Sequence, residues 1–214
     1  MQFGKRVERG WVAPNVEAEL PGLGIVWVTV EGGTGRSPEP VRRRLRGLSD
    51  RFYGSHAIHM RERPIPWAYR VFFRQIGIDP DETRTPVEQL ALDRLHDGAF
   101  KTRGMPEDAL TIAIAETGVA MRAFDADRLD GDLCIRESAP GESLSGSERE
   151  LPPRTLVVAD GRVPLEPLFD GPESDRAVDS STSRIVLAAV SVKNVPSAAV
   201  DEALWLASSA AECA

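Results

Sequence analysis

The spacing of apolar residues changes about halfway along the chain, and this change constrains the fold more than any other feature. Before Gly104, apolar residues recur every three or four positions, as they do on one face of an amphipathic helix. After Gly104 they form short runs separated by turn residues, which is the pattern of strands. We therefore predict an α+β fold with a strand-rich, mixed or antiparallel sheet core that is covered by three to four helices.

The first half contains one strong strand signal and three helix signals. The run GIVWVTV at 24–30 is β-branched and aromatic and lies between turn residues, which predicts a central strand. Apolar positions four, three and four residues apart predict a helix that begins near Pro40 and carries arginines on its outer face. A second helical stripe covers 67–76, and a third helix covers 85–97, where Thr85 and Glu88 form the pattern of a capping box.

The second half is expected to supply most of the sheet. Asp130-Gly131 and Asp160-Gly161 are turn signals, and the polar stretches 138–154 and 170–183 are expected to be loops. Ser197 is expected to cap a closing helix. The strand candidates are Leu110–Ala115, Val119–Phe124, Leu133–Arg136, Thr155–Ala159 and Arg184–Val192.

Length and composition exclude several classes of protein. A chain of 214 residues with 42% hydrophobic content is long enough to bury a core, and it suggests one domain or a closely joined pair. No apolar stretch approaches the ~20 residues that span a bilayer, and the first residues lack the apolar segment of a secretory signal, so we expect a cytoplasmic protein. Cys134 and Cys213 have no paired spacing, which argues against a zinc or redox motif and predicts two reduced thiols.

Charge is distributed unevenly along the chain. The net charge is −7, but residues 1–104 carry 17 Lys and Arg against 13 Asp and Glu, whereas residues 105–214 carry 9 against 20. Four arginines cluster at Arg42, Arg43, Arg44 and Arg46. An arginine face can bind phosphate at contact even on an acidic protein, so these four residues are candidates for binding RNA, and no DNA partner is expected. The alternative is that they form an ordinary solvated helix face.

The common catalytic motifs are absent. The segment 32–36 (GGTGR) follows a strand but lacks the lysine and the spacing of a phosphate-binding loop, so we interpret it as a turn. The chain has no GxSxG motif, and its three histidines, His56, His59 and His96, come with no fixed set of carboxylates. We therefore expect no metal, no other cofactor and no serine hydrolase site.

Several segments resemble the editing domain of the phenylalanyl-tRNA synthetase beta subunit and the free-standing proteins built from that domain, the B3/4 domain. The most specific is MRAFDADRLDGDLCIRESAPGE at 121–142; YRVFFRQIGIDPDETRTPVEQLALDRL at 69–95, LVVADGRVPLEP and STSRIVLAAV add to it in the same order. The resemblance covers about 20–210 and implies a single domain, 1–214. It also implies binding of an aminoacyl ester on tRNA, hydrolysis of that ester, and contact of the tRNA with Arg42, Arg43, Arg44 and Arg46.

The resemblance implies three substrate-binding residues. The family's pocket Asn falls on Thr111, its pocket His falls on Arg122, and its selecting carboxylate falls on Glu173. Arginine stays charged and cannot cycle a proton as histidine does, so Arg122 suits an anion better than it suits catalysis. The alternative for Arg122 is a salt bridge to Asp125 or Asp127.

The altered pocket leaves two functional hypotheses open. The chain is an aminoacyl-tRNA deacylase, or it is a module that binds an amino-acid-like metabolite without catalysis. Asp125 and Glu142 are expected to order the backbone of nearby turns rather than to act on a substrate.

Overall fold

The computed structural model describes residues 6–52, 54, 59–169 and 175–212. Its core is built from two four-stranded sheets. The first sheet has the order β1 (Glu8–Arg9), β3 (Gly24–Glu31), β8 (Arg184–Ser191) and β4 (Ala120–Asp125), and all its strand pairs are antiparallel. The second sheet has the order β2 (Trp11–Val12), β5 (Cys134–Glu137), β6 (Leu156–Ala159) and β7 (Pro164–Pro167). Its β2–β5 pair is parallel, so this sheet is mixed.

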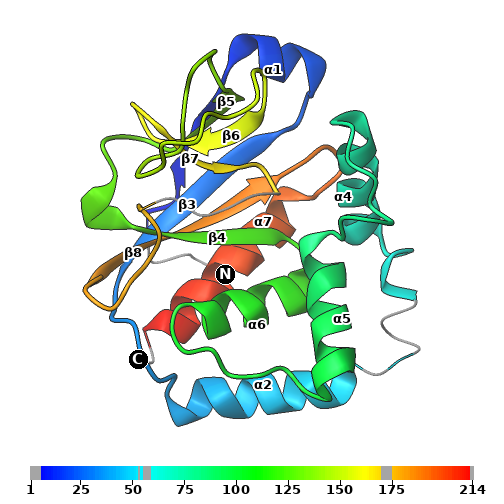
Figure 1. The fold of residues 1–214 in the computed structure, drawn as a ribbon. Helices are drawn as coiled ribbons and strands as arrows, with labels where there is room; N and C mark the ends of the chain where they lie inside the picture. The colour runs from blue at the N-terminus through cyan, green and yellow to red at the C-terminus, as the bar shows by residue number, and fades with distance from the viewer. Residues whose placement is uncertain (1–5, 53, 55–58, 170–174, 213–214) are drawn as a thin grey trace.

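Six α-helices surround these sheets in the described part of the chain (Figure 1). Two of them, α6 and α7, pack against each other beside the first sheet, and α2 lies against α6. α5 also packs on α6, and α1 packs on β5 of the second sheet. A short 3-10 helix, η1 (Ala126–Arg128), follows β4. The helices are α1 (Pro14–Glu19), α2 (Glu39–Arg51), α4 (Pro64–Gln75), α5 (Pro86–Asp97), α6 (Glu107–Thr117) and α7 (Ser197–Ala211).

Alternate residues of β8 serve two separate hydrophobic clusters, because successive side chains of a strand point to opposite faces. Ile185, Leu187 and Ala189 lie in the cluster with α2, α6 and α7. Val186 and Ala188 lie in the cluster between the two sheets, which also holds residues of α4. The first sheet is therefore buried on both faces, and this explains why its central strand reads as a nearly continuous apolar run.

The predicted α+β class is confirmed, as are most of the expected elements. The capping box at Thr85 is formed on both sides, since the Thr85 and Glu88 side chains each meet the partner's backbone. Gly77 and Gly98 have positive φ directly after α4 and α5, as a left-handed helix stop requires. The strands expected near 24–30, 119–124, 133–136, 155–159 and 184–192 are present within one or two residues of their predicted bounds.

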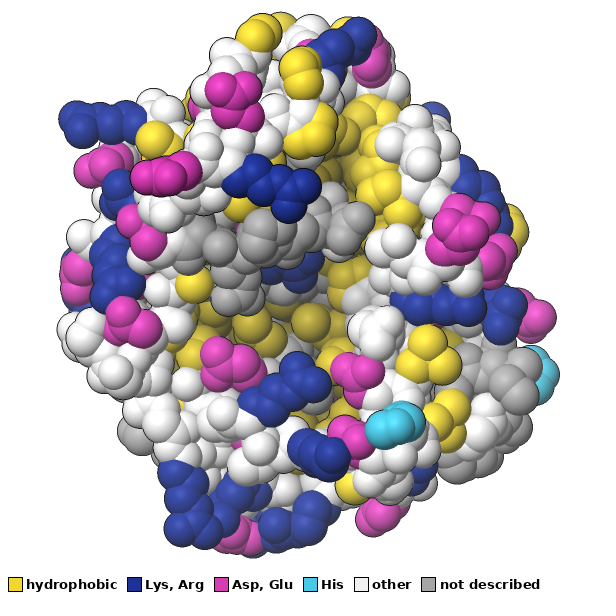
Figure 2. Space-filling model, in the orientation of Figure 1, with side chains coloured by type: hydrophobic (Ala, Val, Ile, Leu, Met, Phe, Trp, Pro, Cys, Tyr) yellow, Lys and Arg dark blue, Asp and Glu magenta, His cyan; other side chains and the backbone are white. Residues whose placement is uncertain are grey.

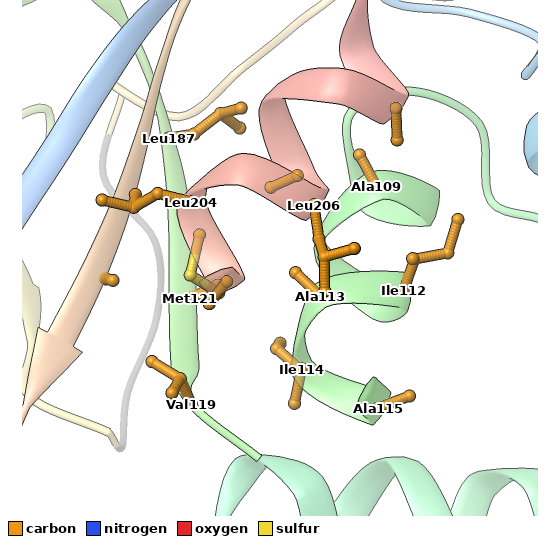
Figure 3. Packing of buried hydrophobic residues seen from close by; sticks show 14 of the residues in the cluster. Ala109, Ile112, Ala113, Ile114, Ala115, Val119, Met121, Leu187, Leu204 and Leu206 are labelled. Atoms are coloured by element: carbon orange, nitrogen blue, oxygen red, sulfur yellow. The ribbon is translucent and has the colours of Figure 1, made fainter. Parts of the chain in front are cut away.

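One expected strand is wrong. Leu110–Ala115 lies in the helix α6, not in a strand. The segment is rich in Ile and Ala and is buried on nearly all sides against α7, β4 and α2, so it shows no polar face from which helical periodicity could be read. Figure 3 shows Ala113 of α6 next to Leu206 of α7.

Smaller corrections concern the ends of the chain and β7. Ser197 is the first residue of α7 and makes no side-chain cap, because Pro196 occupies the N-cap position. The sequence reasoning also missed β1, β2, α1 and the proline-bounded strand β7, so three to four helices was an undercount.

Candidate functional site

A pocket of about 280 Å³ lies where the free edges of the two sheets meet helix α6. β4 is the outer strand of the first sheet and contributes Met121–Phe124, while β7 is the outer strand of the second sheet. Strand β7 contributes Leu165 and Glu166. Helix α6 contributes Glu107, Leu110, Thr111 and Ile114, and the remaining wall is formed by Leu90, Arg103, Ala177 and Val178.

The face shown in Figure 2 is hollowed near its centre, with hydrophobic side chains inside the hollow and charged side chains of both signs around it. The pocket volume is slightly below the ~300–1,000 Å³ typical of drug-sized ligands. It therefore suits a small group such as an amino-acid side chain.

Arg122 joins the edges of the two sheets inside this pocket. Its Nε donates to Oε1 of Glu166 at 2.7 Å, and its Nη1 donates to the carbonyl of Met121 at 3.0 Å. Glu166 is buried, and the Arg122 side chain is 26% exposed. No hydrogen bond joins Nη2 of Arg122 to another described residue, so a fixed cationic donor remains for a ligand.

The alternative salt bridge of Arg122 to Asp125 or Asp127 is wrong, since Glu166 is the partner. Asp127 instead pairs with Arg184. Sequence reasoning missed Glu166, although a glutamate between two prolines in an otherwise apolar strand was a signal that could have drawn attention to it.

Thr111 lines the same pocket from helix α6. Its side chain is half-buried, and within the described residues its hydroxyl makes no hydrogen bond. Thr111 and Arg122, eleven positions apart and on different elements, are thus brought together at one cavity. Glu173 and His56 lie outside the described residues.

Of the predicted tRNA-binding arginines on α2, Arg43 and Arg46 are exposed, whereas Arg42 and Arg44 are partly buried. Lys and Arg side chains gather at the lower edge of the molecule in Figure 2. Arg42 and Arg46 both pair with Glu39, at 2.8 and 2.6 Å. Arg44 pairs with Glu116 of α6 at 3.2 Å, whereas Arg43 is exposed and has no ion pair to a described residue. The positive charge of this helix is therefore partly compensated, and its binding of tRNA stays a prediction.

The expected structural roles of Asp125 and Glu142 are confirmed. Asp125 is buried and accepts hydrogen bonds from the Thr182 hydroxyl and the Asp127 N–H, which orders the turn after β4. Glu142 forms a two-pronged ion pair with Arg136 and accepts the Ala139 N–H. The Arg136 guanidinium holds the pKa of the Glu142 carboxyl below its ordinary value.

Two further properties follow from the part of the chain that the structure describes. No group of three or more His, Cys, Asp or Glu side chains there is placed to hold a metal ion. None of the described helices is long and apolar enough to cross a membrane.

Comparison with known proteins relates this chain to one family. A family model described as the B3/4 domain matches residues 68–212. The phenylalanine–tRNA ligase beta subunit of Legionella pneumophila (strain Lens) is 32% identical over 109 residues, which are 50% of this chain and 14% of that protein. The same subunit of Methylococcus capsulatus is 31% identical over 116 residues, 52% of this chain and 14% of that protein. That of Vibrio vulnificus (strain YJ016) is 38% identical over 85 residues, 37% of this chain and 10% of that protein.

The chain thus spans only about a seventh of the length of these relatives, or less. The family model, in contrast, covers well over half of the chain and includes both Thr111 and Arg122. This chain therefore belongs to the B3/4 domain family, which it shares with the phenylalanine–tRNA ligase beta subunit.

Proposed function

We propose that the pocket at β4, β7 and α6 binds the aminoacyl end of a tRNA and hydrolyses the ester that joins the amino acid to it. The observation that carries this proposal is that Thr111 and Arg122 each offer a hydrogen-bonding group to one small cavity in a B3/4 domain. The matched relatives are named as subunits of a tRNA ligase, which supports tRNA as the carrier of the ester.

The proposed chemistry uses water and no covalent nucleophile. Water attacks the ester carbonyl carbon, the bond from that carbon to the ribose oxygen breaks, and the ribose oxygen takes up a proton as the free amino acid leaves. A guanidinium is a hydrogen-bond donor and has no acceptor, so Arg122 stabilises negative charge on the carbonyl oxygen rather than moving a proton. The Thr111 hydroxyl and backbone N–H groups orient the substrate, and Glu173 is proposed from the family resemblance as the group that selects the side chain.

A panel of mischarged tRNAs tests this proposal. The wild-type protein should release the amino acid from at least one of them faster than the uncatalysed rate. Thr111→Val and Arg122→Lys should lower that release, with about a 10²–10³-fold loss for Arg122→Lys if the guanidinium meets the developing oxyanion. Arg162→Ala, an exposed arginine outside the pocket, is the matched control and should keep full activity. Uncatalysed rates with every tRNA would contradict the proposal.

A binding module for a free amino acid or a similar metabolite is the second candidate. The ion pairs of Arg42, Arg44 and Arg46 favour it, because they reduce the charge that α2 can offer to tRNA. This candidate predicts thermal stabilisation by a free amino acid, lost in Thr111→Val, without hydrolysis of any ester. If α2 does bind tRNA, Arg43→Ala combined with Arg46→Ala should weaken tRNA binding while leaving amino-acid binding unchanged.

A further inference from the structure

A second hollow adjoins the pocket and is lined by two arginines, Arg36 and Arg103, and by two acids. It has a volume of about 490 Å³ and shares Arg103, Glu107 and Val178 with the pocket, so the two cavities are neighbours at these residues. Its other wall is the GGTGR segment, which contributes Thr34, Gly35 and Arg36. We refer to it as the mouth hollow.

Two loops that are distant in sequence are fastened together at the mouth hollow. Met105 donates its N–H to the carbonyl of Gly35 at 2.8 Å, and the two residues form an isolated β-bridge. Gly104 has φ +99°, and a Cβ placed there would lie 2.5 Å from the same carbonyl oxygen. The contact therefore requires glycine at 104, and it places the loop carrying Arg36 beside the loop carrying Arg103.

A buried carboxylate ties both loops to the helix that carries Thr111. Asp108 of α6 is 1% exposed and accepts hydrogen bonds from the hydroxyls of Ser37 and Thr102, at 2.6 and 2.8 Å. It also accepts the N–H of Arg103 at 2.8 Å. Ser37 directly follows Arg36, so Asp108 anchors the loop of Arg36 as well as the loop of Arg103. Asp108 lies three positions before Thr111 in α6. The backbone at Arg36 and Arg103 is thus held in a fixed position relative to the pocket.

The two arginines of the mouth hollow are little neutralised by the protein. Arg36 is exposed and makes no ion pair with a described residue, and Arg103 reaches only Asp93, at 3.6 Å. Two acids also line the hollow, but Asp179 is already paired with Arg128. Glu107 is the other acid, and it lies on the wall shared with the pocket.

We propose that Arg36 and Arg103 bind phosphate groups of the RNA strand that carries the aminoacyl ester, at the entrance to the pocket. This inference rests on the proposed function, since the ester must lie in the pocket while its carrier strand leaves through the mouth hollow. Phosphate contacts of this kind fix the register of a strand without reading its sequence. The hydroxyls of Thr34 and Ser180 at the same hollow are further donors for phosphate or ribose oxygens. Phosphate binding by Arg36 would give the GGTGR segment a role that its sequence pattern did not predict.

The test compares Arg36→Ala/Arg103→Ala with the control Arg149→Ala/Arg162→Ala, which removes two exposed arginines outside both cavities. Binding of a fluorescent, uncharged tRNA is measured at several salt concentrations. The test variant should reduce the slope of log affinity against log salt by about 1.4, since each single-strand phosphate contact contributes about 0.7. This change in slope corresponds to an affinity for tRNA about 25-fold weaker than that of wild type at 0.1 M salt. The control should match the wild-type protein.

Hydrolysis provides a second measurement. Arg36→Ala alone, which leaves the lining of the pocket intact, should raise KM for the aminoacyl-tRNA, while hydrolysis of the methyl ester of the same amino acid, which has no phosphate, should stay within about twofold of wild type. A test variant that binds tRNA as tightly as the control, or a wild-type protein that does not bind tRNA, would overturn this inference. If the test variant loses tRNA affinity as expected but the wild-type protein hydrolyses no ester, the proposed function is refuted and this inference stands.

Discussion

Asp108 should be one of the most sensitive positions for stability, because a single buried carboxylate orders two loops and the start of α6. Asp108→Ala removes the acceptor of three hydrogen bonds, from Ser37, Thr102 and the N–H of Arg103. Thr102 is exposed, so its hydroxyl can turn to water. Ser37 is 1% exposed and cannot.

The magnitude follows from these contacts. A buried donor left without a partner costs about 1–3 kcal/mol, and the Ser37 hydroxyl is such a donor, whereas Arg103 is exposed. Asp108 also lies in the first turn of α6, where a negative charge contributes about 0.3–1 kcal/mol. We expect Asp108→Ala to lower the free energy of unfolding by about 1.3–4 kcal/mol, a substantial share of the ~5–15 kcal/mol typical of a folded protein.

Urea denaturation followed by circular dichroism measures this loss. Asp108→Asn keeps one acceptor oxygen, and the two hydroxyls can rotate to suit it, so we expect a smaller loss of about 1–2 kcal/mol. Asp132→Ala, at an exposed aspartate, is the control and should stay within about 0.5 kcal/mol of wild type. A loss below about 1 kcal/mol for Asp108→Ala would show that the carboxylate does not hold the two loops, and it would refute the reasoning.

Three further predictions concern other parts of the molecule. Tyr69 donates to a β8 carbonyl and accepts a β4 N–H while fully buried, so Tyr69→Phe should lower the free energy of unfolding by about 1–3 kcal/mol in the same urea assay. The hydroxyl and N–H of Ser181 lower the pKa of Asp179 from its ordinary value of 3.8 to about 2. The ionised carboxylate therefore stabilises the fold above pH 3.8, and this stabilisation is lost as the pH falls from 3.8 towards 2. A titration midpoint near 3.8 for this carboxyl, measured by NMR, would contradict this prediction. Burial raises the pKa of Cys134 to about 11, so in a Cys213→Ser background a thiol reagent at pH 8 should label the protein only after unfolding.

Local sequence patterns predict a helix well where capping residues mark its ends. The helix 86–97 follows from Thr85 and Glu88, because a capping box acts within four residues and depends little on the rest of the fold. The segment 110–115 was misread because its helical state depends on packing against α7 and β4, which no local pattern records. Tertiary burial overrode the strand preference of its Ile and Thr residues.

The candidate site shows the same division. Thr111 and Arg122 were predicted from the family resemblance, and both side chains line one pocket. Glu166 could not be linked to Arg122 in advance, because the two residues lie 44 positions apart and meet only where two sheet edges converge. Arg36 and Arg103 are further apart still, and their loops meet through the contact between Gly35 and Met105 and through their shared hydrogen bonds to Asp108.

The most direct measurement of the central claim is a crystal structure of the protein with a non-hydrolysable aminoacyl-nucleotide, in which an amide replaces the ester. We expect the aminoacyl group between Thr111 and Arg122, with the carbonyl oxygen within hydrogen-bonding distance of the guanidinium and the phosphate directed towards Arg36 and Arg103. An analogue bound elsewhere on the molecule, with this pocket unchanged, would contradict the account.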